Sequence, residues 1–597
     1  MSVANVSPAG SASSTPAKRR FCLVLVKPTH YCDDGYPITW YRSAIPSNSL
    51  ACVYGIASDF DKQKAFGDVE LEIHALDEAN TTIRPEQIIK QIKAAGDGMV
   101  MLVGVQSNQT PRALDIAKPM RAAGIKMAVG GFHMSGVISM INGDDPHLRQ
   151  AQAMGISIFA GEAEGRLDEV VRDAMADRLK PLYNFMNDLP GIDGAPIPFL
   201  GRDRVKRVAA STASFDAGRG CPYQCSFCTI INVQGRKSRR RTPDDIENIV
   251  RTNLAQGLSR FFITDDNFAR NKDWEIILDR LIHLREVEKM DFSFIIQVDT
   301  LCYKMPNFID KSRRAGVKRV FIGLENINPA NLIAAKKKQN KITEYRTMLL
   351  QWQQAGILTY AGFITGFPGD TAETILRDVE IIKKELPVDV LEFFYLTPLP
   401  GSEDHQKMFR AGQWMDPDLN KYDLYHITAN HPKMSKEEWA YAYDQAWKSY
   451  YSFDHCETIM RRAGALRAFG NTLFAITWFK GCIEIENVHP VEGGLLRIKA
   501  RRNRRPGLPV EPVWTFYPKY YSEVVVKMLR WAWLYGRLRK IYLGIKHDPK
   551  RKEYTDLAIT PVAEDELETH ELFHTVEAQA YVKQEQRLER IKHGEAA

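Results

Sequence analysis

The sequence predicts an α/β fold in three parts: a doubly wound, Rossmann-like first domain, a partial (β/α)6 barrel of the TIM type, and a mostly helical C-terminal region. Short apolar runs typical of strands alternate with helical stretches from about residue 20 to 178, and a second alternation runs from 205 to 410. Aromatic-rich helical stretches then continue to the end of the 597-residue chain. That length exceeds what a single core supports, at roughly 100 to 200 residues per domain.

The first domain is expected at residues 20–178. Its strand candidates are FCLVLVK, VELEIHAL, GMVMLVGVQ, KMAVGGF and ISIFAGE, separated by helical stretches such as RPEQIIKQIKAAG. Strands that are apolar along their whole length are buried on both faces, which predicts a parallel sheet covered by helices on both sides. Ligands of such domains bind outside the carboxyl ends of the strands, so the loops of interest are PTHYCDDG, QSNQT, GGFHMSG and GEAEG.

The barrel is expected at residues 205–410, after a Pro- and Gly-rich linker at 179–204. Thr242 and Pro243 predict a helix start, because Thr caps helices well and Pro suits the first helical position. The strand candidates are RFFITDD, FSFIIQVD, VKRVFIGLE, ILTYAGFITGFPG and VLEFFYLTPLPG. With the strand before the cysteine cluster they make six β/α units, too few to close an eightfold barrel. The loops after the strands would line the active site, as in full barrels.

The C-terminal region, residues 411–597, is expected to be helical, basic and aromatic-rich. Between Arg497 and Lys552 there are sixteen Lys/Arg and three Asp/Glu, a local charge of +13, whereas the whole chain carries +7. The interleaved aromatic residues are Trp514, Trp531, Trp533, Tyr535 and Tyr542. Three interpretations are open: a helix that packs its aromatic residues on the barrel, contact with an anionic membrane or a lipid-like substrate, and, least favoured, binding of nucleic acid.

Composition indicates a soluble globular protein. The chain is 44% hydrophobic and 26% charged, and no apolar run approaches the roughly 18 to 20 residues of a membrane span. Residues 1–19 are small and polar and predict a disordered tail without a secretory signal. We therefore expect a cytoplasmic location, with peripheral membrane contact as an open alternative. Six cysteines without a pairing framework predict structural thiols in a reducing compartment: Cys22, Cys32, Cys52, Cys302, Cys456 and Cys482.

The other three cysteines lie in RGCPYQCSFC, Arg219 to Cys228, at the spacing C-x3-C-x2-C. Gly220 and Pro222 prevent an ordinary helix here, and the three thiolates are expected to converge on one metal site. Structural zinc and cluster sites normally take four protein ligands. With no fourth cysteine nearby, one position would stay open, which is typical of a catalytic metal site. The alternative is a zinc knuckle completed by a distant His or Cys.

This stretch resembles the signature of the radical S-adenosylmethionine (SAM) superfamily, whose motif C-x3-C-x-aromatic-C is matched by Cys221, Cys225, Phe227 and Cys228. The resemblance implies a 4Fe-4S cluster on the three cysteines, SAM chelated by the open iron, and cleavage of SAM to a deoxyadenosyl radical by one electron. It also implies an electron donor such as flavodoxin or ferredoxin. Expected SAM contacts are Phe227 and Gly366 near the adenine, Thr264, Asp265 and Asp266 at the amino group, Glu325 at the ribose, and Gln297 on the preceding strand.

A doubly wound domain ahead of such a barrel resembles the cobalamin-binding branch of the superfamily, over about residues 20 to 410. The resemblance implies cobalamin contacts from Gly104, Gln106, Ser107, Gly130, Gly131, Gly161 and Glu162. One departure concerns the motif D-x-H-x-x-G, which supplies a histidine ligand to cobalt in part of this branch. Here the loop reads KPTHYCDDG, with Pro28 at the Asp position and Asp33 at the Gly position. We therefore do not expect His30 to bind cobalt.

The resemblance favours a cobalamin-dependent radical SAM methyltransferase acting on an unactivated carbon of a small-molecule or lipid-like substrate. The alternative is a cyclase or rearrangement enzyme resembling the anaerobic magnesium-protoporphyrin monomethyl ester cyclase, because fold and cofactors do not separate the two. A tRNA methylthiotransferase would bring three further cluster cysteines, and Cys22, Cys32 and Cys52 do not look like such a set. A non-catalytic iron-sulfur or nucleic-acid-binding protein is disfavoured by the intact SAM-facing residues. The sequence identifies no catalytic acid or base.

Overall fold

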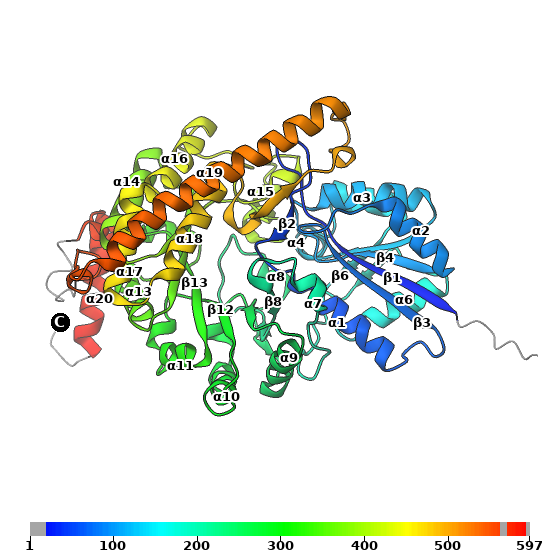
Figure 1. The fold of residues 1–597 in the computed structure, drawn as a ribbon, viewed down its shortest axis with the longest axis horizontal. Coiled ribbons are helices and arrows are strands. Elements are labelled where there is room, and N and C mark those ends of the chain that lie inside the picture. The colour runs from blue at the N-terminus through cyan, green and yellow to red at the C-terminus, as the bar shows by residue number, and fades with distance from the viewer. Residues whose placement is uncertain (1–18, 561–569, 593–597) are drawn as a thin grey trace, which may run out of the picture.

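The computed structural model of the protein describes residues 19–560 and 570–592. The predicted α/β class is confirmed: two parallel six-stranded sheets are followed by a mostly helical C-terminal region (Figure 1). In Figure 1 the first domain, coloured blue to cyan, lies beside the green barrel, and the yellow to red C-terminal helices lie largely on the far side of the barrel. The expected disordered tail, apart from Arg19, falls outside the described residues.

The first sheet is doubly wound. Its strands are all parallel, in the order β3 (Glu70–Asp77), β1 (Arg20–Lys27), β4 (Gly98–Leu102), β5 (Lys126–Gly130), β6 (Ser157–Ala160) and β7 (Leu182–Asn184). Alternate residues of β1 enter different cores: Leu23 packs with α1 (Asn48–Lys62) and α6 (Leu167–Met175), and Val24 with the helices on the other face. Those helices are α2 (Pro85–Ala95), α3 (Thr110–Ala122), α4 (Phe132–Ile141) and α5 (Pro146–Ala153). The edge strand β7 lies in the segment expected as a linker.

The second sheet is an open barrel. Its parallel strands are β15 (Val390–Tyr395), β14 (Leu358–Thr365), β13 (Val317–Glu325), β12 (Ser293–Val298), β11 (Arg260–Ile263) and β8 (Thr212–Phe215). In the described part of the chain β15 and β8 do not pair, so the barrel is partial, as expected. The outer helices are α9 (Pro243–Ala255), α10 (Trp274–Glu286), α11 (Phe308–Ala315), α13 (Tyr345–Gln354) and α14 (Ala372–Glu385). Thr242 caps α9 in a capping box with Asp245.

The C-terminal region is tied to both domains. Helix α15 (Glu403–Arg410) ends the barrel segment, and the helices of the C-terminal region are α16 (Lys436–Tyr450), α17 (Phe453–Leu466), α18 (Gly470–Gly481), α19 (Val513–His547) and α20 (Val576–Lys592). One strand here was not expected: β16 (Gly494–Ile498) pairs antiparallel with β2 (Thr39–Ser43) of the first domain. Across residues 19–560 and 570–592, no helix combines the length and apolarity needed to cross a membrane.

Candidate active site

A cavity of about 570 Å³ lies where the first domain, the barrel and the C-terminal region meet. Its walls include His30 after β1, Gln106 and Ser107 after β4, and Thr264 and Asp266 after β11. The C-terminal region contributes the segments 422–424 and 491–493. Because α/β sheets bind their ligands at the carboxyl ends of their strands, this cavity is the candidate active site.

A short ribbon holds the loop that carries the cysteine triad. Strand β9 (Gly218–Arg219) pairs antiparallel with β10 (Arg239–Arg240), which closes the intervening loop. Gly220 enters the loop at φ +88°, and a Cβ there would lie 2.5 Å from the Lys237 carbonyl oxygen, so only glycine fits. Inside the loop the Cys221 amide donates to the Gly235 carbonyl, and the Cys228 amide to the Cys225 carbonyl.

The triad fits a multi-iron cluster better than one shared ion. Two sulfurs bound to a single zinc at about 2.3 Å each cannot be more than about 4.6 Å apart. In the described ranges, the three cysteine sulfurs do not all lie within 4.8 Å of one another. The group of ligand atoms that meets this limit is Cys22, Glu72 and His74. Burial raises the pKa of Cys221 to about 11 and that of Cys228 to about 12, so both thiols need a bound metal to stay deprotonated at neutral pH.

Three polar residues follow β11, and the structure gives them different surroundings. Asp266 lines the cavity, and Thr264 lines it as well, with its hydroxyl donating to the Phe215 carbonyl at 3.2 Å. Asp265 is buried and accepts hydrogen bonds from the amides of Ala217 and Gly218 at 2.7 and 2.9 Å, which fixes the start of the cysteine loop. Desolvation raises the pKa of both aspartates to about 7, although the Asp266 side chain is exposed whereas Asp265 is buried. Their expected contact with SAM stays a prediction.

Glu325 forms a buried ion pair with Lys337, a residue that sequence patterns did not single out. Lys337 belongs to a run of three lysines, which usually indicates a solvated surface. Here its ammonium lies 5.8 Å from the centroid of the Phe227 ring. Burial alone would lower the pKa of Lys337, but the charges of Glu325 and Cys225 outweigh it and raise the pKa. The pair shows that the expected ribose contact, Glu325, and the motif aromatic, Phe227, lie in one neighbourhood.

The remaining expected SAM contacts are placed at neighbouring strand ends. Gln297 of β12 donates to the Asp265 carbonyl at 3.3 Å. Gly366 follows β14 at φ +93°, and a Cβ there would lie 1.8 Å from Cζ2 of Trp439. The Asp370 carboxylate holds this turn by accepting from the amides of Gly366 and Phe367, both at 2.9 Å. Phe227 packs in the same small cluster as Phe367.

The glycine-rich loops of the first domain lie close together around a second hollow of about 160 Å³. It is lined by Gly104, Gly130, Gly131, Gly161 and Glu162, whereas Gln106 and Ser107 face the larger cavity. Gly131 has φ +146°, and a Cβ there would lie 2.2 Å from the Val105 amide nitrogen. The loops after β4, β5 and β6 therefore approach each other as only glycine permits. Contact of these residues with cobalamin stays a prediction.

A buried ion cluster joins the first domain to the cysteine loop, and local sequence patterns gave no sign of it. Arg219, two residues before Cys221, binds Glu164 at 2.6 and 2.9 Å, Glu162 at 2.7 Å and Asp216 at 2.7 Å. Arg239 also binds Glu162, and Arg241 completes the cluster near Asp216. Burial would raise the pKa of Asp216, but the charges of Arg219 and Arg241 outweigh it and hold the pKa below its usual value.

His30 has a carboxylate partner in the cavity wall. Its Nε2 lies 2.7 Å from Oε2 of Glu492, which also accepts from the Tyr425 hydroxyl at 2.9 Å. Burial alone would lower the pKa of His30, but the charge and hydrogen bond of Glu492 outweigh it and raise the pKa. Within the described chain Nδ1 of His30 is buried without a hydrogen-bond partner. The expectation that His30 does not bind cobalt stays a prediction.

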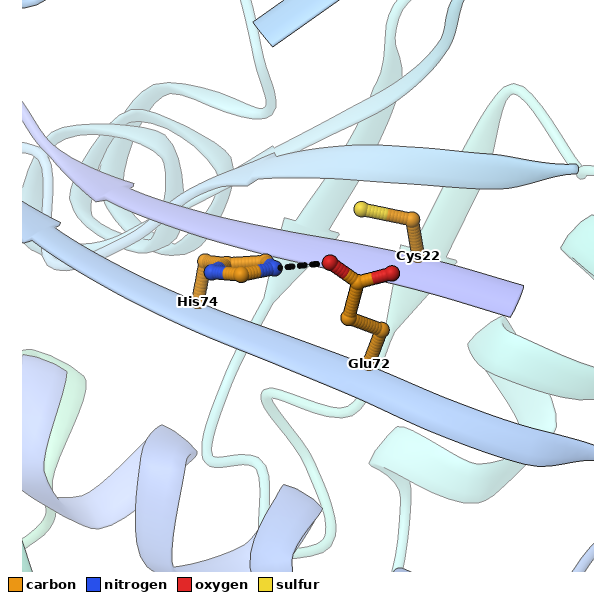
Figure 2. Close-up of side chains that lie close together, drawn as sticks. All are labelled: Cys22, Glu72 and His74. Carbon is orange, nitrogen blue, oxygen red and sulfur yellow. Dashed lines mark hydrogen bonds and ion pairs between the residues drawn. The ribbon is translucent and has the colours of Figure 1, made fainter. Parts of the chain in front are cut away.

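A second group of metal-ligating side chains lies outside this cavity (Figure 2). Cys22 of β1 faces Glu72 and His74 of β3, and one ligand atom from each lies within 4.8 Å of the others. His74 Nε2 lies 2.8 Å from Oε1 of Glu72, and Gln91 also binds this pair. Burial and the Glu72 charge raise the pKa of Cys22 to about 12, so the thiol keeps its proton. The hydrogen bonds account for the group without a metal.

Comparison with known proteins defines the class. Residues 217–411 match the family model of the radical SAM superfamily. That range holds the β9–β10 ribbon with its cysteine loop and the barrel strands β11 to β15. Residues 217–411 therefore form a radical SAM domain, and domains of this class use a 4Fe-4S cluster and SAM.

Three curated relatives are similar to this chain at modest identity. Bacteriochlorophyllide d C-8(2)-methyltransferase of Chlorobaculum tepidum is 26% identical over 352 residues, which cover 55% of this chain and 73% of that protein. Hopanoid C-2 methylase of Rhodopseudomonas palustris is 28% identical over 268 residues, 44% of this chain and 50% of that protein. Anaerobic magnesium-protoporphyrin IX monomethyl ester cyclase of Synechocystis matches a shorter part, 28% over 186 residues, 30% of this chain and 35% of that protein.

One solved structure covers nearly all of the fold. The cobalamin-dependent SAM radical enzyme OxsB, with aqua-cobalamin bound, aligns at a TM-score of 0.50 and 14% identity over 94% of this chain and 84% of that one. At this identity the likeness concerns the fold alone. It extends beyond the barrel to the doubly wound domain and the C-terminal region.

Proposed function

We propose that this radical SAM enzyme binds cobalamin in its first domain and methylates an unactivated carbon of a small or lipid-like molecule. One observation carries the proposal: a single cavity of about 570 Å³ is lined both by the strand-end loops of the doubly wound domain and by residues after β11 of the radical SAM barrel. A substrate bound there would lie next to both the proposed cobalamin site and the proposed SAM site. The first two relatives, named as methyltransferase and methylase, support the same outcome.

The chain's own residues have assigned tasks in this proposal. Cys221, Cys225 and Cys228 would hold the 4Fe-4S cluster, and Gln339 would donate to the Cys225 sulfur, which it approaches at 3.6 Å. The expected SAM contacts, Phe227, Thr264, Asp265, Asp266, Gln297, Glu325 and Gly366, would orient SAM. When bound, the cluster and SAM supply a radical that removes a substrate hydrogen, and cobalamin supplies the methyl group. The remaining task of the protein is to exclude water and fix orientation.

Cobalamin would lie against the loops after β4, β5 and β6. The support is geometric: Gly104, Gly130, Gly131, Gly161 and Glu162 line one hollow, and Gln106 and Ser107 offer polar groups to the adjoining cavity. Glu162 is engaged with Arg219 and Arg239, so we assign it a supporting contact with the loop backbone rather than a free carboxylate. His30 would not hold cobalamin, because its Nε2 is paired with Glu492.

The cavity walls combine apolar and polar side chains. Trp40, Phe132, Phe262 and Leu399 supply apolar surface, and His30, Asp266, Asp423 and Glu492 are among the many polar or charged residues that line the rest. Such walls fit a substrate with an apolar part and with polar groups that fix its orientation. We further infer that an electron donor such as flavodoxin or ferredoxin reduces the cluster, and that residues 497–552 make peripheral contact with a membrane.

The test is product analysis with SAM after anaerobic reconstitution. Methyl transfer predicts both deoxyadenosine and S-adenosylhomocysteine, whereas the cyclase or rearrangement alternative predicts deoxyadenosine alone. Cys225→Ser should lose both products. Gly131→Val should lose S-adenosylhomocysteine and keep deoxyadenosine, because it alters only the first domain. A wild-type protein that makes deoxyadenosine but no S-adenosylhomocysteine, with cobalamin bound, would refute the methyltransferase proposal.

A further inference from the structure

The outer face of α19 is apolar and exposed. Eight of its large side chains keep more than half of their surface in solvent: Val513, Trp514 (78%), Tyr521 (60%), Val525, Val526, Met528, Leu529 (65%) and Trp533. Soluble proteins expose single apolar residues everywhere, but a continuous apolar surface of this kind marks a binding site. In Figure 1 this helix lies along the outside of the molecule.

Helical spacing places these side chains on one stripe. Trp514, Tyr517, Tyr521, Val525 and Leu529 follow one another at intervals of three or four residues, and Trp533 continues the series. The buried residues Phe516, Leu534, Leu538 and Ile545 lie on the opposite face, which packs on the rest of the C-terminal region. The charged residues between positions 514 and 536 are Lys519, Glu523, Lys527 and Arg530, and none of them falls on the apolar stripe.

A groove beside the stripe extends the apolar surface. It has a volume of about 540 Å³ and runs between α18, β16 and the first half of α19. Phe474, Leu495 and Leu496 in its wall are each about half exposed. The chain that forms this wall, Gly494 to Arg497, directly continues the segment 491–493 that lines the large cavity. The apolar surface and the candidate active site are therefore lined by adjoining parts of one segment, residues 491–497.

Four cations near the stripe lack a carboxylate partner. Arg530, Arg537, Arg539 and Lys540 have no carboxylate oxygen within 4.0 Å in the part of the chain that the structure describes. Arg530 does donate to the Glu484 carbonyl at 2.6 Å, and Arg537 lies over the Phe453 ring. Lys527, in contrast, is held by Glu486 and Glu523. Unpaired Arg and Lys beside a stripe of Trp, Tyr, Val and Leu match the two layers of an anionic membrane surface, in which charged headgroups cover hydrocarbon.

We propose that the apolar stripe of α19, with the adjoining groove, docks in the plane of an anionic lipid membrane. This rests on the proposed function, which it deepens by naming the membrane surface from which a lipid-like substrate would reach the cavity. The helix would lie in the interface with Trp514, Tyr521 and Trp533 at headgroup level. A second copy of the chain is a poorer occupant, because pairing two stripes would also bring together the unpaired cations beside them.

The test is flotation of the full-length protein with vesicles of phosphatidylcholine, with and without phosphatidylglycerol. We expect binding to the anionic vesicles that weakens in high salt. Val525→Glu combined with Leu529→Glu should weaken binding at least about 100-fold, since both side chains would have to enter hydrocarbon. Arg539→Gln combined with Lys540→Gln should weaken it about thirtyfold, from roughly 1 kcal/mol for each cation near an anionic surface.

As a control, two exposed apolar residues of the barrel are replaced by glutamate. Ile276→Glu combined with Val287→Glu, at barrel positions that are 59% and 64% exposed, should leave vesicle binding unchanged. Absence of wild-type binding to anionic vesicles, or binding that the α19 variants leave intact, would overturn the proposal. So would a dimer in solution that Val525→Glu and Leu529→Glu separate. Deoxyadenosine formation is measured in the same preparations. A protein that forms deoxyadenosine but does not bind vesicles would contradict the docking proposal alone and leave the proposed chemistry intact.

Discussion

The buried ion cluster between the first domain and the cysteine loop predicts a strong coupling between Glu164 and Arg219. Three guanidinium groups and three carboxylates make up the cluster, so its charge is balanced. Glu164→Leu would leave one positive charge in excess at a place where the side chains of Arg219 and Glu164 are only 9% and 4% exposed. Arg219→Met would leave Glu164 buried without its cation.

The magnitude follows from the geometry. Glu164 receives two hydrogen bonds from Arg219, at 2.6 and 2.9 Å. Two unit charges about 4 Å apart interact by about 4 kcal/mol at an effective dielectric constant of about 20. Removing one partner of such a buried pair typically lowers the free energy of unfolding by about 3–5 kcal/mol, because the other charge stays buried and unpaired. Each single variant should lose that amount, and the double variant Glu164→Leu/Arg219→Met should recover at least half of it.

Hydrogen–deuterium exchange measures the effect locally, which avoids assuming two-state unfolding of a multidomain chain. Amides of segments 157–167 and 212–220 should exchange roughly two to four orders of magnitude faster in the single variants, the equivalent of 3–5 kcal/mol, and much less so in the double variant. The exposed ion pair of Lys180 and Glu169 provides the control. Replacing either residue by alanine should change hydrogen exchange little. Additive effects, with a coupling energy below about 0.5 kcal/mol, would refute the reasoning.

Three further predictions concern the barrel. Cys225→Ser should lose cluster iron and SAM cleavage together, measured by iron count and deoxyadenosine yield, and Cys456→Ser should lose neither. Gly366→Ala should lower the melting temperature more than Gly412→Ala, because a Cβ at 366 would lie 1.8 Å from Trp439, whereas at 412, also at positive φ, nothing lies within 4 Å; equal effects would contradict this. Burial raises the pKa of Glu392 from 4.5 to about 8, so between these two pH values unfolding releases its proton. The free energy of unfolding should therefore fall by up to about 1.4 kcal/mol per pH unit as pH rises through this range. Glu392→Gln should flatten the pH dependence of urea unfolding, and an unchanged slope would contradict the assignment.

Sequence patterns predicted the elements that are set by local periodicity. The continuous apolar runs correspond to strands β1, β3 to β6 and β11 to β15, because strands buried on both faces must be apolar throughout. The cysteine spacing identified the loop at Cys221 for a similar reason: the whole motif lies within eight residues. The pairing of β2 with β16 was not predictable in this way, since those strands are separated by most of the chain and meet only in the tertiary fold.

Contacts between domains were also missing from the sequence analysis. Arg219 stands beside the motif, but its partners Glu162 and Glu164 belong to the first domain, so no local pattern connects them. Lys337 was not singled out, since runs of lysine are common on solvated surfaces, whereas the fold buries it beside Glu325. Sequence patterns left three interpretations of α19 open. The structure shows that Trp531 and Tyr542 pack inward, while Trp514 and Trp533 face solvent, because a helix that packs on one side buries the residues of that face alone.

Anaerobic reconstitution with iron, sulfide and hydroxocobalamin, followed by desalting, measures the binding of both proposed cofactors in one experiment. We expect about four irons per chain together with stoichiometric cobalamin, and we expect Cys225→Ser to lose the iron while keeping the cobalamin. Retention of the cluster without cobalamin would contradict the proposed two-cofactor site and leave a cobalamin-independent radical reaction in its place.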